Sequence, residues 1–198
     1  MNTLWNRYPA LEACRDEIEH AVDRIEATYR AGGKLLLCGN GGSAADCEHM
    51  AGELLKGFLS KRPVLDPAIP EDLRTRLQGS LPAIPLTSIS AALTASLNDL
   101  DPAVAYAQLL QGLGEKGDLL VAISTSGNAQ NVLCAARLAK AKGMSVLAMT
   151  GADGGALAGV ADICIRVPER ETYCVQEYHL PVYHYLCAEV EDRLFGKA

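Results

Sequence analysis

The sequence predicts an α/β fold in which one parallel sheet carries helices on both faces. Short apolar runs alternate with helical patterns along the chain, and two of these runs end in turns rich in Gly and Ser. Because a helix between two parallel strands returns the chain to the same edge of the sheet, this alternation favours a parallel arrangement. The expected strands cover residues 34–38, 83–87, 118–123, 144–149 and 162–167.

An amphipathic helix, expected over residues 7–31, precedes the first strand. Apolar side chains recur in it at helical spacing, and Gly32 and Gly33 follow as a stop signal. This apolar stripe needs a partner surface, which is either the chain's own sheet or a second subunit. The recurring residues are Leu11, Cys14, Ile18, Ala21, Val22, Ile25 and Tyr29.

Two turns follow the first and third expected strands. They read G-N-G-G-S over residues 39–43 and S-T-S-G-N over residues 124–128. Each turn would place free backbone N–H groups and serine hydroxyls at the positive end of a helix, where α/β sheets bind phosphate. Together they predict a phosphorylated ligand, while Ser and Gly that only cap helices are the structural alternative.

The first turn also matches a dinucleotide-binding fingerprint, G-x-G-x-x-A, through Gly39, Gly41 and Ala44. That fingerprint requires an acidic residue at the end of a second strand about twenty residues later. The chain instead enters a proline-rich stretch, which counts against a nicotinamide or flavin cofactor. We interpret residues 61–82 as an excursion from the sheet, a lid or a subunit contact, with a short helix over residues 71–78.

Histidines and acids gather on two predicted helices. His49 and Glu53 are four residues apart on one helical face, which suits two ligands of one metal ion or an acid/base pair. The same spacing also arises by chance on a solvent-exposed face. In the last helix, expected over residues 172–195, we expect Pro181 to kink the helix and His179 to lie at a surface or interface. The polar candidates of this helix are Gln176, Glu177, His179 and His184.

Composition limits the classes of function. A chain of 198 residues that is 49% apolar can bury one core, so we expect a single domain over residues 1–198, with residues 61–82 as an insertion. The net charge of -6, without a cluster of Lys or Arg, disfavours nucleic acid as a partner. Seven scattered cysteines indicate reduced thiols. Without a signal peptide or a membrane-spanning run, we expect a cytoplasmic protein with no membrane partner.

Taken together, the motifs resemble those of the phosphoheptose isomerase family in the sugar isomerase (SIS) superfamily. The resemblance rests on G-N-G-G-S, H-x-x-x-E, S-x-N-D, I-S-T-S-G-N, G-x-D-G-G and V-Q-E-x-H-x-x-x-x-H, in that order. It implies a flavodoxin-like three-layer sandwich, the SIS domain, and a homotetramer, or alternatively a dimer, with active sites at subunit junctions. It also implies isomerisation of sedoheptulose 7-phosphate to D-glycero-D-manno-heptose 7-phosphate, for bacterial lipopolysaccharide or related heptose synthesis.

By this resemblance, Glu53 corresponds to the catalytic base and His184 to the catalytic acid. A carboxylate that moves a proton between C1 and C2, beside a group that protonates the neighbouring oxygen, interconverts ketose and aldose. The implied ligands of one zinc ion are His49, Glu53, Gln176 and His184. The implied contacts to the sugar and its phosphate are Asn40, Gly41, Gly42, Ser43, Asn98, Asp99, Ser124, Thr125, Ser126 and Gln176.

Three features depart from the family pattern. Ala129 replaces a phosphate-binding Ser, and Gly57 stands where an Arg is found, with Lys56 beside it as a replacement cation. The insertion over residues 61–82 is longer than the usual loop. These departures leave another sugar phosphate open as the substrate. A non-catalytic member that binds sugar phosphates or regulates a partner is the alternative function, but such members lack the glutamate and the late histidine.

Overall fold

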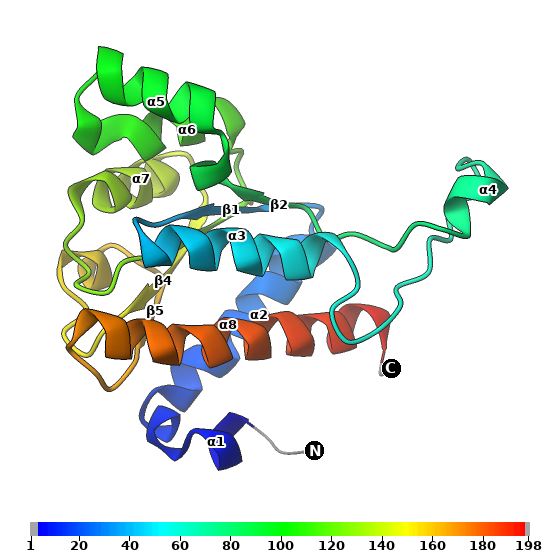
Figure 1. Cartoon of the computed structure of the whole chain (residues 1–198), viewed down its shortest axis with the longest axis horizontal. Helices are drawn as coiled ribbons and strands as arrows, with labels where there is room; N and C mark the ends of the chain where they lie inside the picture. The colour runs from blue at the N-terminus through cyan, green and yellow to red at the C-terminus, as the bar shows by residue number, and fades with distance from the viewer. Residues whose placement is uncertain (1–3, 197–198) are drawn as a thin grey trace.

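Five parallel strands in the order β2-β1-β3-β4-β5 form the centre of the computed structural model, which describes residues 4–196 (Figure 1). Every pairing is parallel, and Leu36 lies opposite Ile84 on one side and Leu120 on the other. This strand order is the flavodoxin-like one, so the predicted fold class is confirmed. The strands are β1 (Leu35–Cys38), β2 (Ala83–Pro85), β3 (Leu119–Ile123), β4 (Ser145–Thr150) and β5 (Ile163–Arg166).

Strand side chains alternate between two buried cores, one on each face of the sheet. Leu35 and Leu37 point to a face covered by α2 (Arg15–Arg30), α3 (Gly42–Leu55) and α8 (Thr172–Phe195). Leu36 and Cys38 point to the other face. Because both faces are covered, β1 and β3 are apolar at every position. The helices of the second face are α5 (Ser90–Asp99), α6 (Ala105–Leu113) and α7 (Gln130–Ala141).

The N-terminal segment is helical but is not one α-helix. The short helix α1 (Leu4–Arg7) and the 3-10 helix η1 (Pro9–Cys14) precede α2, so the α-helix expected over residues 7–31 covers only Arg15–Arg30. Pro9 fixes its own backbone and has no N–H with which to continue a preceding helix. The apolar stripe of α2 is buried against β5 and α8 of the same chain.

Residues 56–82, here called the arm, leave the sheet between α3 and β2 and project from the body of the protein (Figure 1). The arm carries α4 (Glu71–Arg74), which is shorter than the helix expected over residues 71–78. Four of its leucines are exposed to solvent, which makes the arm a candidate contact surface. They are Leu59, Leu65, Leu73 and Leu77.

The remaining elements connect these layers. Helix α8 runs as one helix of 24 residues through Pro181. Among residues 4–196, no helix combines the length and the apolarity that crossing a membrane requires. Three further 3-10 helices are η2 (Leu86–Ser88), η3 (Pro102–Val104) and η4 (Ala156–Gly159).

Candidate active site

Helices α3 and α8 lie side by side on one face of the sheet and run in the same direction (Figure 1). Gly42 at the start of α3 lies beside Gln176, and His49 further along contacts Tyr183. Helix α3 follows β1 and α8 follows β5, so both begin at the carboxyl edge of the parallel sheet. Polar residues that are far apart in the sequence therefore meet between these two helices.

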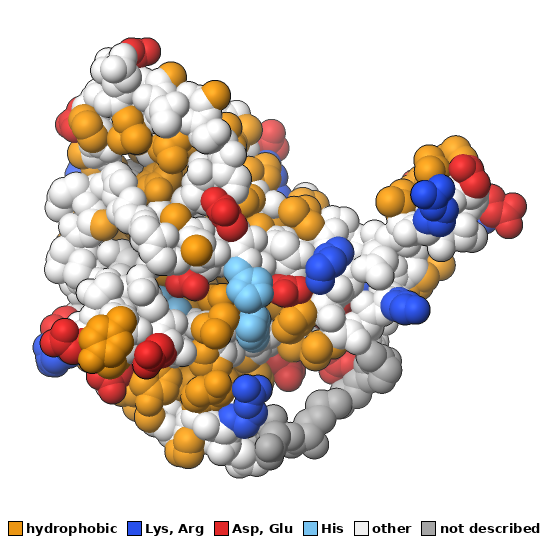
Figure 2. Space-filling view, in the orientation of Figure 1, with side chains coloured by type: hydrophobic (Ala, Val, Ile, Leu, Met, Phe, Trp, Pro, Cys, Tyr) orange, Lys and Arg blue, Asp and Glu red, His pale blue; other side chains and the backbone are white. Residues whose placement is uncertain are grey.

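Three of the predicted residues converge there: His49 and Glu53 from α3, and His184 from α8. His49 Nε2 lies 3.2 Å from Glu53 Oε1 and 3.4 Å from His184 Nε2. One ligand atom of each residue lies within 4.8 Å of the others, so the group could hold a metal ion. Figure 2 shows histidine side chains near the middle of this face, with acidic side chains beside them. Imidazole nitrogens and a carboxylate are typical zinc ligands.

In the group of His49, Glu53 and His184, here called the trio, Glu53 and His184 are half-buried, and a charged side chain lies beside Glu53. The Glu53 side chain is only 16% exposed, and its Oε2 accepts a hydrogen bond of 3.0 Å from Lys56 Nζ. Burial is the main cause that lowers the pKa of His184, and repulsion from His49 lowers it further, while Glu53 acts in the opposite direction. Lys56 thus places a cation next to the Glu53 carboxylate.

Two residues that the motifs do not single out complete the surroundings of His49. The Tyr183 hydroxyl and His49 Nδ1 share a hydrogen bond of 2.9 Å. Burial raises the pKa of the nearby Asp46 carboxyl, and interaction with the Tyr183 hydroxyl and with His49 partly offsets this effect. Their spacing in the sequence could have indicated both residues. Asp46 precedes His49 by about one helical turn, and Tyr183 directly precedes His184.

The two Gly/Ser turns follow β1 and β3, the neighbouring strands at which the order of the sheet reverses. Such a switch point is where open α/β sheets bind ligands. Gly41 has a φ of 56°, a backbone conformation that favours glycine, and it precedes the first residue of α3. Asn40 connects the first turn to α7, the helix that follows the second turn, because its amide exchanges two hydrogen bonds of 2.9 Å with the amide of Asn131.

The second turn leaves hydroxyl groups available to a ligand. Ser124 is buried and Thr125 is half-buried, and neither hydroxyl has a hydrogen-bond partner in the described part of the chain. The Ser126 hydroxyl accepts a hydrogen bond from the backbone N–H of Asn128. In the first turn, Ser43 is buried at the second position of α3. The turns thus offer short donors at the start of two helices.

Other predicted residues lie away from the trio. Gln176 packs against Gly42, where a Cβ atom would come within 2.5 Å of its Nε2, so it lies at the first turn. Asn98 and Asp99 end α5, beyond the opposite face of the sheet, and Asn98 Nδ2 donates to Asp99 Oδ1. Within residues 4–196, no hydrogen bond joins these residues to the trio.

The position of His179 contradicts the expectation that this residue lies at a surface or interface. Its side chain is fully buried, and its Nε2 lies 3.4 Å from the backbone oxygen of Thr150. Burial lowers its pKa to about 4. The expectation was wrong because the face of α8 that carries His179 turns toward the end of β4 rather than toward solvent.

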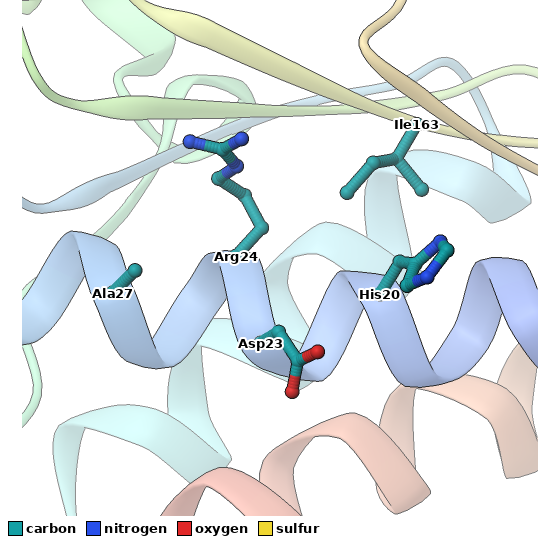
Figure 3. Close-up of a pocket in the computed structure, with 5 residues that line it drawn as sticks. All are labelled: His20, Asp23, Arg24, Ala27 and Ile163. Atoms are coloured by element: carbon teal, nitrogen blue, oxygen red, sulfur yellow. The ribbon is translucent and has the colours of Figure 1, made fainter.

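A separate cavity of about 450 Å³ lies between α2 and β5 (Figure 3). His20, Asp23 and Arg24 line it from α2, and Ile163 lines it from β5. In Figure 3 the His20 ring turns toward Ile163, while Asp23 points away from it. The residues that line this cavity belong neither to the two turns nor to the trio, so we do not assign it as the active site.

The structure shows the surroundings of Gly57 and Ala129, the two positions at which the resemblance implies other side chains. A Cβ atom at Gly57 would lie 2.1 Å from the backbone oxygen of Ser60, so an arginine does not fit unless the arm moves. Ala129 is the N-cap residue of α7 and offers no side-chain acceptor there. The backbone N–H of Val132 in the first turn of α7 donates instead to Asn131 Oδ1.

Fold and site together define a SIS-domain protein, and residues 8–151 match the SIS domain family. Phosphoheptose isomerase from Rhodospirillum rubrum is 42% identical over 181 residues, which cover 91% of this chain and 88% of that relative. The chain therefore belongs to the phosphoheptose isomerase family.

Solved structures of the same family support the match. The phosphoheptose isomerase from Francisella tularensis superposes with a TM-score of 0.80 at 31% identity, covering 94% of this chain and 91% of that one. The phosphoheptose isomerase GmhA from Neisseria gonorrhoeae has a TM-score of 0.79 at 32% identity, with the same coverage of 94% and 91%. The likeness thus extends well beyond the motifs.

Proposed function

We propose that this protein converts sedoheptulose 7-phosphate to D-glycero-D-manno-heptose 7-phosphate in heptose biosynthesis. The observation that carries the proposal is the convergence of Glu53 and His184 on His49, between two helices that begin at the phosphate-binding edge of the sheet. Relatives named phosphoheptose isomerase, similar over most of the chain, support this substrate.

Glu53 and His184 suit the two proton transfers of an aldose–ketose isomerase. The Glu53 carboxylate removes a proton from C1 of the ketose, and His184 protonates the C2 oxygen as the electron pair forms the C1–C2 double bond. The Glu53 carboxyl then returns its proton to C2, and His184 takes the proton of the C1 hydroxyl as the aldose carbonyl forms. Both groups end in their starting protonation states.

The turns supply the binding of the phosphate and the sugar. Backbone N–H groups at Gly41 and Gly42, and the hydroxyls of the second turn, are suited to phosphate oxygens. Gln176 adds an amide beside the first turn. We assign this binding role to Asn40, Gly41, Gly42, Ser43, Ser124, Thr125, Ser126 and Gln176, with Asn98 and Asp99 as contacts to sugar hydroxyls.

The donor set of the trio fits zinc, because it combines two imidazole nitrogens with one carboxylate. His49, Glu53 and His184 would hold the ion, and the Gln176 amide oxygen is the fourth proposed ligand. A bound zinc ion would polarise the sugar carbonyl. The packing of α3 against α8 holds the three donor side chains in place.

We further propose a homotetramer that works in the cytoplasm. Helix α5 buries only Ser96 among its residues, and both Leu97 within it and Leu100 at its C-terminal end are exposed. The arm adds further exposed leucines. A neighbouring subunit that covers these surfaces could bring its own Asn98 and Asp99 to the site. Light scattering would test this assembly, and a monomeric mass would contradict it.

The activity is tested by proton NMR with sedoheptulose 7-phosphate in deuterated water and zinc-loaded protein. We expect the aldose phosphate to form with deuterium at C2, and we expect Glu53→Gln to abolish turnover without loss of the fold. Glu48→Gln is the matched control, because Glu48 lies exposed on the same helix and its carboxylate accepts a hydrogen bond from Thr87. An inert wild-type protein, or full activity of Glu53→Gln, would contradict the proposal.

A further inference from the structure

We propose that Asp46 and Tyr183 form a hydrogen-bond relay that holds His49 in the form able to bind zinc, with its lone pair at Nε2. The inference rests on the proposed function, since it concerns the metal of that site. Asp46 and Tyr183 would act through His49 and are therefore positioning residues. Neither residue belongs to the ligand set that the motifs imply.

The geometry places the three residues in sequence between α3 and α8. Tyr183 is 1% exposed, and its hydroxyl lies 2.9 Å from His49 Nδ1. The Asp46 carboxyl lies close enough to the same hydroxyl for each group to influence the pKa of the other, although no hydrogen bond joins the two side chains within residues 4–196. Asp46 Oδ2 is buried and has no hydrogen-bond partner within residues 4–196. A buried carboxylate oxygen without a partner is costly, so this atom is a ready acceptor for a hydroxyl.

A neutral imidazole has one N–H group and one lone pair, and its neighbours decide which nitrogen carries the proton. His49 Nε2 faces Glu53 and His184, so Nε2 must offer the lone pair if the trio is to bind a metal ion. The proton then resides on Nδ1, which needs an acceptor. The Tyr183 oxygen can accept it while the Tyr183 hydroxyl donates to Asp46, because a carboxylate only accepts.

A second arrangement of the same atoms competes with the first. If the Tyr183 hydroxyl donates to His49 Nδ1, then Nε2 carries the proton and donates to Glu53 Oε1. In that arrangement Asp46 receives no hydrogen bond from Tyr183, and the trio cannot bind a metal ion through His49. Asp46 thus favours the metal-binding arrangement, since only there does it receive the hydroxyl proton.

The Tyr183 ring is held in place by the histidines as well as by its own helix. Its ring centroid lies 5.4 Å from that of His49 and 5.0 Å from that of His184, in edge-to-face contacts. Removal of the hydroxyl alone should leave this packing intact. Tyr183→Phe therefore separates the hydrogen bond from the packing of the ring.

The experiment measures zinc affinity by competition with a chelator. We expect Tyr183→Phe and Asp46→Asn each to weaken zinc binding about 10- to 100-fold, which is typical when a partner of a metal-bound histidine is lost. Tyr185→Phe is the matched control, because its hydroxyl donates to Glu19 and not to the site. We expect that control to bind zinc as the wild type does.

The double variant tests whether Asp46 acts through Tyr183. With Phe at position 183, Asp46→Asn should weaken zinc binding no further, because the relay is already broken. An equal additional loss would show that Asp46 acts only by its charge, and this would overturn the relay. Nitrogen NMR of the metal-free protein gives a second readout, in which Tyr183→Phe should move the His49 proton from Nδ1 toward Nε2.

The outcomes separate this inference from the proposed function. A wild type that binds zinc, together with single variants that bind it equally well, would overturn the relay and leave the zinc site standing. A wild type without zinc affinity would overturn the zinc site and the relay with it. Unchanged melting temperatures of the metal-free variants would exclude loss of the fold as the cause of weaker binding.

Discussion

Arg62 Nε donates a hydrogen bond of 2.7 Å to Glu191 Oε1, and both side chains are buried. Arg62 also donates to the backbone oxygens at the end of α3, on Glu53 and Leu54. The pair therefore ties α3, the root of the arm and α8 together, and Glu53 and His184 lie on the two helices that it joins. Glu191 further accepts the backbone N–H groups of Phe58, Leu59 and Ser60.

Arg62→Met should destabilise the protein strongly. Removal of one partner leaves a buried charge without compensation, and we expect a loss of about 3–5 kcal/mol in the free energy of unfolding, measured by urea denaturation. Arg193→Met is the control, because Arg193 pairs with Asp23 and Glu26 at the surface and its loss should cost under about 1 kcal/mol. Equal losses in the two variants would contradict the special role of Arg62.

The stability of the protein should depend on pH through His179. Its pKa is about 4 in the folded state against an ordinary value of 6.5, so between these values the unfolded state binds more protons. The free energy of unfolding should therefore fall as the pH drops from 6.5 to 4, by roughly 3 kcal/mol from this residue. His179→Gln should flatten this part of the curve, because an amide does not titrate. An unchanged slope would show that other groups cause it.

Gly57→Arg should disturb the root of the arm. Its Cβ atom would lie 2.1 Å from the Ser60 backbone oxygen, and we expect a loss of about 1–3 kcal/mol in urea denaturation. Gly52→Ala is the comparison, because a Cβ there meets nothing within 4 Å inside α3. Alanine suits a helix interior better, so that variant should gain about 1 kcal/mol. A stable Gly57→Arg protein would contradict the clash.

Zinc should raise the melting temperature through the trio. A ligand at 100 times its dissociation constant stabilises the folded state by about 2.7 kcal/mol, which calorimetry or a thermal shift assay detects. His49→Ala should lose this response. His20→Ala should keep it, because His20 lies on α2 at the separate cavity. A similar zinc response in both variants would place the ion elsewhere.

Much of the fold could be predicted from the sequence because its signals are local. The alternation of apolar runs and helical patterns indicated the strands and the parallel sheet, and Gly and Ser marked the turns after β1 and β3. His49 and Glu53 could be paired for the same reason, since four residues of helix bring them to one face. The start of the N-terminal α-helix was predicted too early, because Leu11 and Cys14 fit the helical spacing although they lie in a 3-10 helix that begins at Pro9.

Other features depended on contacts between distant segments. Spacing alone did not bring His184 to His49, which lies 135 residues earlier; the parallel packing of α3 and α8 did. The same packing decided that His179 is buried, that Tyr183 contacts His49, and that Arg62 meets Glu191. The sequence by itself therefore determined the elements, the turns and the residues able to do the chemistry. Only the tertiary structure decided which side chains meet, because burial and hydrogen bonding between helices depend on how their faces pack rather than on local spacing.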